Sequence, residues 1–422
     1  MRFLKTPLPS GNFAYLTFLI GLIGVGLVMV YSASYVHSME RFGNGYAVIQ
    51  KHIAYLLIGS VFFLVASRIP MEWLAQYSRI IFIGVLVSLI LVLIPGVGLR
   101  SGGARRWVAL AGFTFQPAEL LKCLYPFFFA CWHNLLKDLY GEEVIGNFKD
   151  GFLKILGLPV LLSVFLILQP DYGTTAILWA TTFVLLFLAR YQLRYILGSI
   201  FIFGMSSYGL IVTSPYRMKR LLTYLDPWKD PLNSGFQIIQ SMTAFHSGGF
   251  FGKGLGNSQA KLYYLPAAQN DFIFSIVGEE VGWIGVILIC VLFFGLIYQG
   301  FRSAFRAKTE IGQLYGFGFS SLLGVQALIN MSVSLGIVPN KGLTLPFVSY
   351  GGSSLVSLLA GAGFIYSLGF ESERIESTHH VPKIKLKTKS VRSRKPVSVQ
   401  SFKKVNRPIK RKSKSLTRSR KR

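Results

Sequence analysis

Residues 271–299 read DFIFSIVGEEVGWIGVILICVLFFGLIYQ, and this stretch decides the fold class. An apolar run of roughly 20 residues spans the ~30 Å hydrocarbon core of a bilayer as a helix. Similar runs recur along the chain, and they are continuous rather than alternating, which favours helices over barrel strands. Only 14% of the residues are charged, against about 25% in soluble proteins. The sequence therefore predicts an all-α polytopic membrane protein.

Ten such runs are predicted to span the membrane. They lie at about 13–33, 49–67, 79–96, 117–133, 152–169, 173–190, 194–213, 271–299, 313–336 and 343–369. Lys and Arg residues in the short loops gather on one side if the N-terminus is cytoplasmic, and an even number of spans places the C-terminus there too. The predicted parts are a cytoplasmic N-terminus at 1–12, a ten-span domain at 13–370 and a tail at 371–422. Residues 214–270 form a large extracytoplasmic loop between spans 7 and 8.

The net charge of +27 comes mainly from the tail. Residues 381–422 hold 18 Lys and Arg and no acid, which leaves +9 for residues 1–380. A segment so basic and so poor in apolar residues is expected to be disordered. Binding to anionic lipid is favoured over nucleic acid, because each Lys or Arg near the surface contributes about 1 kcal/mol.

Two outer loops, 98–116 and 214–270, are basic on the face where the charge rule expects few cations. An anionic ligand such as a phosphate or diphosphate head group would explain this excess. Arg105 and Arg106 of the first loop stand beside Trp107, and Lys253 and Lys261 belong to the glycine-rich end of the second. These cations are predicted to contact the ligand.

Asp271 follows that glycine-rich stretch and opens the apolar run at 271–299. It can be a helix cap, which typically contributes about 1 kcal/mol, or a carboxylate in a basic cleft that takes a proton from a sugar hydroxyl. Glu279 lies about 80° around the helix from Asp271 and could share its cleft. Glu280 points the other way and is expected to contact another helix. Both glutamates have a structural alternative, because charges inside spans are often paired.

The other candidates lie at the starts of later spans. Glu119 and Lys122 can pair at i, i+3, or Lys122 can face a polar cavity. Asp171 is expected to cap the helix that follows it. Lys341 lies in PNKGLTLPFVSYGGSS (339–354), whose prolines and glycines predict a broken helix against a wet cavity or protein. The three cysteines lie in apolar runs without metal-ligand spacing.

Four stretches together resemble the SEDS family of shape, elongation, division and sporulation proteins, the relatives of FtsW, RodA and SpoVE. They are GARRWVALAGFTFQPAELLK (103–122), QPDYGT (169–174), residues 235–282, and PNKGLTLPFVSYGGSS (339–354). The likeness runs from about residue 13 to 370, and the last stretch is more similar to the division member than to the elongation member.

The resemblance implies a peptidoglycan glycosyltransferase that polymerises lipid II at the outer face of the bacterial plasma membrane and releases undecaprenyl diphosphate. A class B penicillin-binding protein and other division proteins at the septum are the implied partners. The family's essential acid matches Asp271, its arginine–tryptophan pair matches Arg106 and Trp107, and its span-4 lysine matches Lys122. No cofactor is implied with certainty, and a divalent cation (Mg²⁺ or Mn²⁺) is left open.

The sequence departs from the family pattern just before the aspartate. The usual PEAHTDF reads PAAQNDF at 266–272, so that an acid and a histidine are missing. Asp271 is then predicted to act without a partner base nearby, with cations and Glu279 around it. Two other functions are kept as alternatives, a flippase for lipid II and a non-enzymatic scaffold that recruits the penicillin-binding protein.

Overall fold

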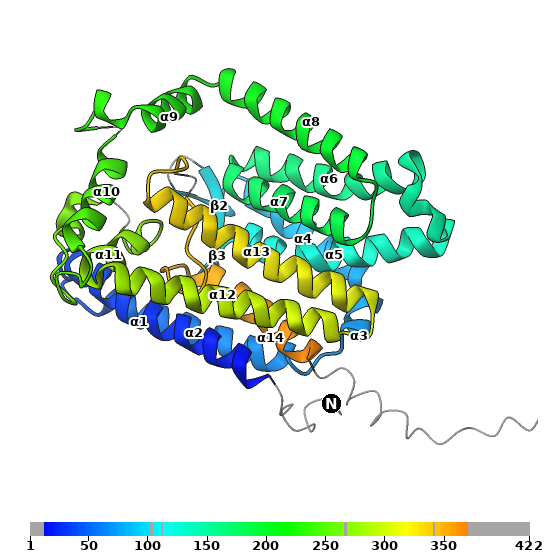
Figure 1. The fold of residues 1–422 in the computed structure, drawn as a ribbon, viewed down its shortest axis with the longest axis horizontal. Coiled ribbons are helices and arrows are strands. Elements are labelled where there is room, and N and C mark those ends of the chain that lie inside the picture. The colour runs from blue at the N-terminus through cyan, green and yellow to red at the C-terminus, as the bar shows by residue number, and fades with distance from the viewer. Residues whose placement is uncertain are drawn as a thin grey trace, which may run out of the picture. The chain divides into compact units, whose positions relative to one another are not determined.

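Long apolar helices lie side by side in the computed structural model (Figure 1). The structure describes residues 12–101, 104–110, 113–233, 235–265, 268–340 and 342–369, all within one of the chain's two units, Met1–Thr378. The predictions for residues 1–11, Lys341 and the tail fall outside the described residues.

Each predicted span contains a helix. These helices are α1 (Phe13–Phe42), α2 (Ala47–Ala66), α4 (Ser78–Leu93), α5 (Pro117–Tyr140), α6 (Lys154–Leu168), α7 (Tyr172–Leu188), α8 (Leu193–Val212), α12 (Gly282–Arg306), α13 (Glu310–Ser334) and α14 (Gly352–Leu368). Six helical segments are long and apolar enough to cross a membrane, and α4, α7 and α14 are shorter apolar helices. The all-helical, multi-pass membrane fold is confirmed, and the count of ten crossings stays a prediction.

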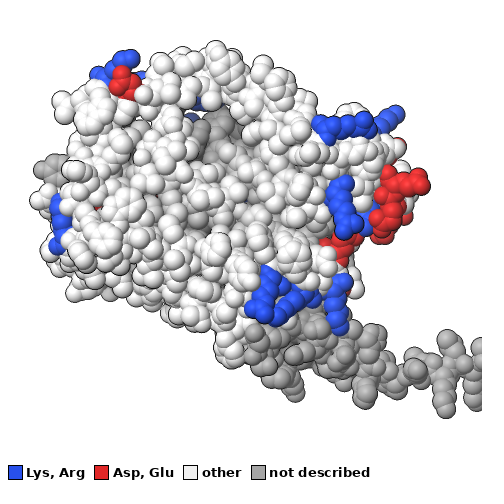
Figure 2. All heavy atoms as spheres, in the orientation of Figure 1, with Lys and Arg blue, Asp and Glu red and all other residues white. Residues whose placement is uncertain are grey.

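Charged side chains are distributed as a bilayer requires. On the face shown in Figure 2, Lys, Arg, Asp and Glu gather toward the two ends of the bundle and leave a broad uncharged region between them. Large apolar side chains of the long helices are exposed, for example Phe201 of α8 and Phe294 of α12, which are 69% and 74% exposed. Exposed apolar surface of this extent is typical of a lipid-facing wall.

The remaining elements belong to the segments that connect the long helices along the chain. Short helices are α3 (Met71–Gln76), α9 (Pro215–Leu225), α10 (Phe236–Gly248), α11 (Ile273–Glu280), η2 (Glu142–Gly146), η3 (Phe148–Leu153), η4 (Pro227–Lys229) and η5 (Ala260–Tyr264). The loop at 98–116 folds into an antiparallel sheet of β1 (Gly98–Ser101), β2 (Ala104–Leu110) and β3 (Phe113–Phe115) in the order β1-β2-β3. The sequence did not predict this small sheet.

The predicted span at 271–299 is broken in the structure. Helix α11 ends at Glu280, and α12 begins at Gly282, whose φ is +71°. A Cβ at Gly282 would lie 2.4 Å from the backbone nitrogen of Gly252. The break therefore exists because the glycine-rich loop before Asp271 packs directly on this point of the chain. Asp271 and Glu279 precede the membrane-length helix α12.

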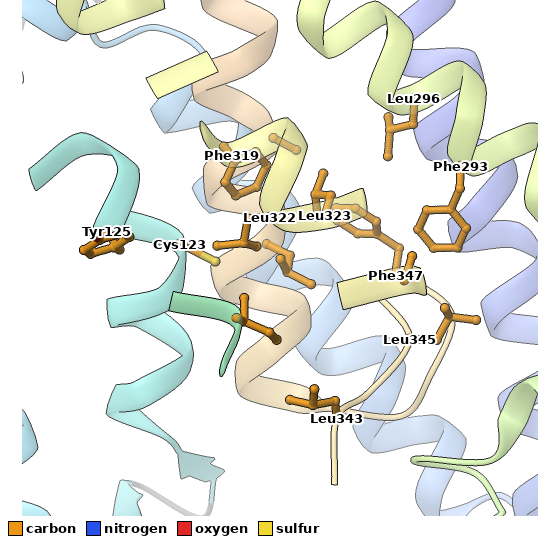
Figure 3. Packing of buried hydrophobic residues seen from close by; sticks show 14 of the residues in the cluster. Cys123, Tyr125, Phe293, Leu296, Phe319, Leu322, Leu323, Leu343, Leu345 and Phe347 are labelled. Atoms are coloured by element: carbon orange, nitrogen blue, oxygen red, sulfur yellow. The ribbon is translucent and has the colours of Figure 1, made fainter. Parts of the chain in front are cut away.

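The predicted break at 339–354 is confirmed, because α14 begins only at Gly352. The irregular segment before it runs through the interior, where Leu343, Leu345 and Phe347 are at most 6% exposed. Figure 3 shows these side chains among those of α5, α12 and α13. Apolar packing against these helices holds one side of this non-helical backbone in place.

Helix α1 packs closely on this segment at Gly26. A Cβ there would lie 2.5 Å from the carbonyl oxygen of Phe347 and 2.9 Å from the Cα of Val348. We expect Gly26→Ala to destabilise the protein by about 1–3 kcal/mol, the typical cost of overpacking. A Cβ at Gly24 on the same helix would meet nothing within 4 Å, so Gly24→Ala is the control and should stabilise by up to about 1 kcal/mol. Equal melting temperatures of the two variants in detergent would contradict the close contact.

Candidate active site

Asp271 lines a cavity of ≈ 200 Å³ near one end of the bundle. The wall comes from segments far apart in the sequence. It consists of Tyr55, Arg106, Trp107, Thr114, Gln116, Glu119, Asp171, Thr174, Asn270, Asp271, Gly342, Leu343, Thr344, Tyr350, Gly351, Gly352 and Ser354. The structure thus brings together the acid, the arginine–tryptophan pair and the two motifs at 169–174 and 339–354.

Four helices begin at this cavity, namely α5, α7, α11 and α14. Unpaired backbone N–H groups give a helix N-terminus a partial positive charge of about half a unit, which attracts anions. Residues from or just before the first turns line the wall, among them Gln116, Thr174 and Ser354. Glu119 already lies in the first turn of α5 and Asp171 caps α7, so that α14, which has no side-chain cap, is the N-terminus best suited to a bound anion.

Asp271 does not cap helix α11. The N-cap position belongs to Phe272, and no side chain caps the helix there, so the capping interpretation is wrong. Burial raises the pKa of Asp271 to about 6, against the opposing effects of an Asn340 hydrogen bond and the charge of Arg220. A carboxylate with that pKa is ionised at neutral pH and is a better proton acceptor than an ordinary aspartate.

The backbone around Asp271 is held by two contacts that the sequence did not predict. The amide of Asn330 on α13 donates to the carbonyl oxygens of Asp271 at 2.8 Å and Leu343 at 2.6 Å. The backbone nitrogen of Tyr350 donates to the carbonyl of Gln269 at 2.9 Å. Asn330 thereby joins the segment before α11 to the segment before α14. A polar amide within an apolar span was the available signal for this residue.

Arg106 reaches from β2 to the turn between α6 and α7. Its Nε donates to the carbonyl of Gln169 at 3.1 Å, and a second guanidinium nitrogen donates to the carbonyl of Pro170. Trp107 follows it in the cavity wall, whereas Arg105 is not among the lining residues. Of the two predicted arginines, the structure places only Arg106 at the cavity.

Asp171 caps helix α7, as predicted. Its carboxylate accepts from the backbone nitrogen of Thr174 at 3.2 Å and from the Thr174 hydroxyl at 2.9 Å. Gln116 also donates to it, at 3.4 Å. Asp171 lines the cavity with its hydrogen-bond capacity largely used, and we assign it a structural role.

Lys122 forms the internal pair with Glu119 rather than lining the cavity. Its Nζ lies 2.7 Å from a Glu119 oxygen, close but not aligned as a hydrogen bond, and the lysine side chain is fully buried. Glu119 lines the cavity, whereas Lys122 does not. The lysine therefore contacts the cavity wall through its pair with Glu119.

Lys253 and Lys261 do not reach the cavity either. The Nζ of Lys253 lies 2.8 Å from Glu279, and the Nζ of Lys261 lies 2.9 Å from Glu280. The sequence shows these cations but not their partners, so the prediction that they hold the ligand lacks support in this structure. Glu279 likewise turns toward Lys253 and does not share the cavity of Asp271.

These two ion pairs tie the loop at 248–261 to the end of α11. Glu279 accepts from the hydroxyl of Ser258 and from the backbone nitrogens of Gln259 and Ala260. Burial opposes its ionisation, but the bonds from Lys253, Ser258 and the loop backbone outweigh burial and hold the pKa of Glu279 below its ordinary value. Glu280 accepts at 2.7 Å from Ser32 on α1, which confirms the expected contact with another helix.

Among the described residues, no group of three or more His, Cys, Asp or Glu side chains could hold a metal ion. The described carboxylates of the cavity therefore do not form a Mg²⁺ or Mn²⁺ cage by themselves.

The family model for FtsW, RodA and SpoVE, described as cell cycle protein, matches residues 13–374 of this chain. A probable peptidoglycan glycosyltransferase FtsW from Geobacter metallireducens is 40% identical over 85% of this chain and 94% of its own. Stage V sporulation protein E from Bacillus subtilis is 39% identical over 82% and 93%.

Solved structures show the same fold. A chain from a peptidoglycan synthase complex that coordinates polymerization and crosslinking has a TM-score of 0.67 and 27% identity, over 86% of this chain and 98% of that one. The rod shape determining protein RodA from Thermus thermophilus has a TM-score of 0.60 and 25% identity, over 86% and 97%. The chain belongs to the FtsW/RodA/SpoVE family of cell cycle proteins.

Proposed function

We propose that this chain is a peptidoglycan glycosyltransferase that polymerises lipid II at the outer face of the bacterial membrane. Its relatives are named for this activity. The observation that carries the proposal is the cavity that combines Asp271, Arg106 and several helix N-termini. Such a site can activate a sugar hydroxyl and bind a diphosphate in the same small volume.

Asp271 is the proposed general base. It accepts the proton of the 4-hydroxyl of an incoming lipid II while that oxygen attacks the anomeric carbon of the growing glycan. The bond from that carbon to undecaprenyl diphosphate breaks, and the diphosphate leaves with the bonding electrons. A well-placed base typically contributes 10²–10⁴-fold to such a step.

Arg106 and the N-terminus of α14 are the proposed diphosphate site. Negative charge grows on the leaving group as the bond breaks, and preorganised positive groups stabilise it most in the transition state. Trp107 would pack beside the head group. Lys341 stays a predicted contributor outside the described residues, while Arg105, Lys122, Lys253, Lys261 and Glu279 are proposed to act structurally.

The activity is proposed to serve septal synthesis in cell division, as the FtsW-named relatives suggest. The partner would be a class B penicillin-binding protein that crosslinks the new strands, together with other division proteins. Both termini would be cytoplasmic, with 214–270 as the extracytoplasmic loop of the domain at 13–370. The basic tail at 371–422 would bind anionic lipid.

Arg106→Ala is expected to lower polymerisation by roughly 10–100-fold, because charge-assisted hydrogen bonds are worth about 1.5–3 kcal/mol. Arg105→Ala is the matched control, since Arg105 is the preceding residue of β2 and does not line the cavity. The rate of glycan formation from purified lipid II is measured for both. If the two variants lose activity equally, the loss reflects the sheet and Arg106 has no special role.

A flippase was the alternative suggested by charges inside spans. The structure pairs Lys122 with Glu119 and pairs Glu279 and Glu280 with lysines, so these charges no longer favour a polar path. Polymerisation and flipping of lipid II are to be measured on the same proteoliposomes, with the partner synthase present. Flipping without polymerisation would overturn the proposed function. The absence of both activities would favour the scaffold.

A further inference from the structure

A second cavity, of ≈ 800 Å³, lies between α4, α5 and α6. It shares no lining residue with the cavity of Asp271. Glu119 and Phe128 of α5 line the first and second cavities respectively, and these residues are nine positions apart on the helix, or roughly 14 Å. Its volume is in the usual range for small-molecule sites, and the proposed reaction does not use it.

One part of this cavity is polar and contains both signs of charge. Arg79, Lys154 and Asp138 line it. Lys154 is already bonded to Asp150 at 2.7 Å and lies 4.0 Å from the centre of the Tyr140 ring. In the described part of the chain, Arg79 and Asp138 form no ion pair. The cavity therefore offers a cation and an acid that are free to bind a ligand.

The rest of the wall is apolar. It includes Phe82 and Ile83 of α4, Phe128 of α5, and Leu158 and Leu161 of α6. Val160 and Leu161 are 49% and 43% exposed beside it, as expected of helices in contact with acyl chains. Trp132 lines the cavity and is 38% exposed, a residue type that favours the head-group level of a bilayer.

We propose that this cavity retains one phosphatidylethanolamine molecule. Its phosphate lies at Arg79, its ammonium donates to Asp138, and an acyl chain runs along Phe82, Phe128 and Leu161. Charge complementarity selects this lipid, since a purely anionic head group would meet Asp138 without an ammonium to pair with it. Under the proposed topology, the lipid belongs to the inner leaflet.

Gly157 provides a sharp test, because it lines the cavity and a Cβ there meets nothing within 4 Å. Gly157→Leu fills the space and adds a better helix former. Gly204→Leu on α8 is the matched control, with equally open surroundings outside the cavity. Native mass spectrometry of mildly extracted protein should find one bound phosphatidylethanolamine on the wild type and on Gly204→Leu. Gly157→Leu should lose it by at least about tenfold in occupancy.

Head-group selectivity is the second measurement. Delipidated protein is titrated with phosphatidylethanolamine, phosphatidylglycerol and undecaprenyl phosphate, and Arg79→Glu is compared with wild type. Phosphatidylethanolamine should bind tightest, and Arg79→Glu should weaken it by roughly tenfold. Three results would overturn the proposal: no lipid on the wild type, equal retention by Gly157→Leu, or preferential binding of either anionic lipid. None of these bears on polymerisation at Asp271, so the two proposals fail separately.

Discussion

Asp271→Asn is expected to lower polymerisation of lipid II by at least roughly 10²-fold without lowering the stability of the protein. The loss follows from removing the base, which typically contributes 10²–10⁴-fold. Asn keeps the size of the side chain and changes only its charge and its ability to accept a proton. Because Asp271 does not cap α11, the substitution removes no helix-stabilising contact of that kind.

The stability of the wild-type protein is predicted to depend on pH through Asp271. Burial raises the pKa of Asp271 in the folded protein to about 6, above that of an ordinary carboxyl. A group with a raised folded pKa contributes stability at low pH that is lost as the pH rises through the folded value. Wild type should therefore lose part of its stability between about pH 4 and 6, and Asp271→Asn should not. At neutral pH the variant should melt at or above the wild-type temperature.

The rate should depend on pH in the opposite sense. The base must be ionised, so polymerisation by wild type should rise with pH and level off above about pH 6. Asp226→Asn is the control for removing a carboxylate from the same part of the chain, since Asp226 is exposed and pairs only loosely with Lys229 at 3.4 Å. Polymerisation by Asp271→Asn at the wild-type rate would refute the general-base role. A lower melting temperature for it alone would instead favour a structural role.

The bundle could be predicted because a bilayer leaves few structures for an apolar run. Every run longer than about 17 residues had to be helical, and the structure confirms a helix in each. The helix boundaries that were predicted wrongly depend on contacts between residues that are distant in the sequence. The run at 271–299 looked continuous, but the glycine-rich loop packs on Gly282 and separates α11 from α12.

The candidate site was predictable where a residue type alone carries the chemistry. Asp271, Arg106 and Trp107 were singled out, and the structure brings them to one cavity. Two of the predicted cations have partners 19 to 26 residues away, Glu280 for Lys261 and Glu279 for Lys253. A sequence shows where a lysine is, but it does not show which acid will form an ion pair with it.

The same limit explains why the local network was missed. Asn330 lies 59 residues from Asp271, whose carbonyl it binds, and Tyr55 binds the backbone of Thr114 from α2 at 3.1 Å. Neither belongs to a motif with a recognised spacing. The missing acid and histidine before Asp271 suggested a base without support, whereas the structure supports it through backbone contacts from α13 and the segment before α14.

Glu280→Ala is expected to destabilise the protein by roughly 3–5 kcal/mol, the cost of breaking a buried ion pair by removing one partner. Glu280 is completely buried, and its oxygens accept from Lys261 at 2.9 Å and Ser32 at 2.7 Å. The Lys261 side chain is only 7% exposed, so that its ammonium would have little water to solvate it without the carboxylate. Thermal unfolding in detergent measures the loss.

The exposed pair of Lys229 and Asp226 is the matched control. Its side chains are 81% and 44% exposed, and surface pairs are worth only about 0–1 kcal/mol. Lys229→Met should therefore change the melting temperature far less than Lys261→Met. Similar shifts for the two lysines would mean that the pair at Glu280 is not the buried contact described here.

The double variant Lys261→Met with Glu280→Leu separates a structural lysine from one that binds substrate. Replacing both members of a buried pair by apolar residues of similar size is often neutral or stabilising, so the double variant should recover most of the stability that each single change loses. If Lys261 only ties the loop at 248–261 to α11, polymerisation should recover with stability, to within a few-fold of wild type. If Lys261 instead holds the diphosphate, a stable double variant would stay at least about tenfold slower, because a charge-assisted contact worth about 1.5–3 kcal/mol would be gone. The Nζ of Lys261 already lies within hydrogen-bond distance of Ser32 and Glu280, and recovery is the result we expect.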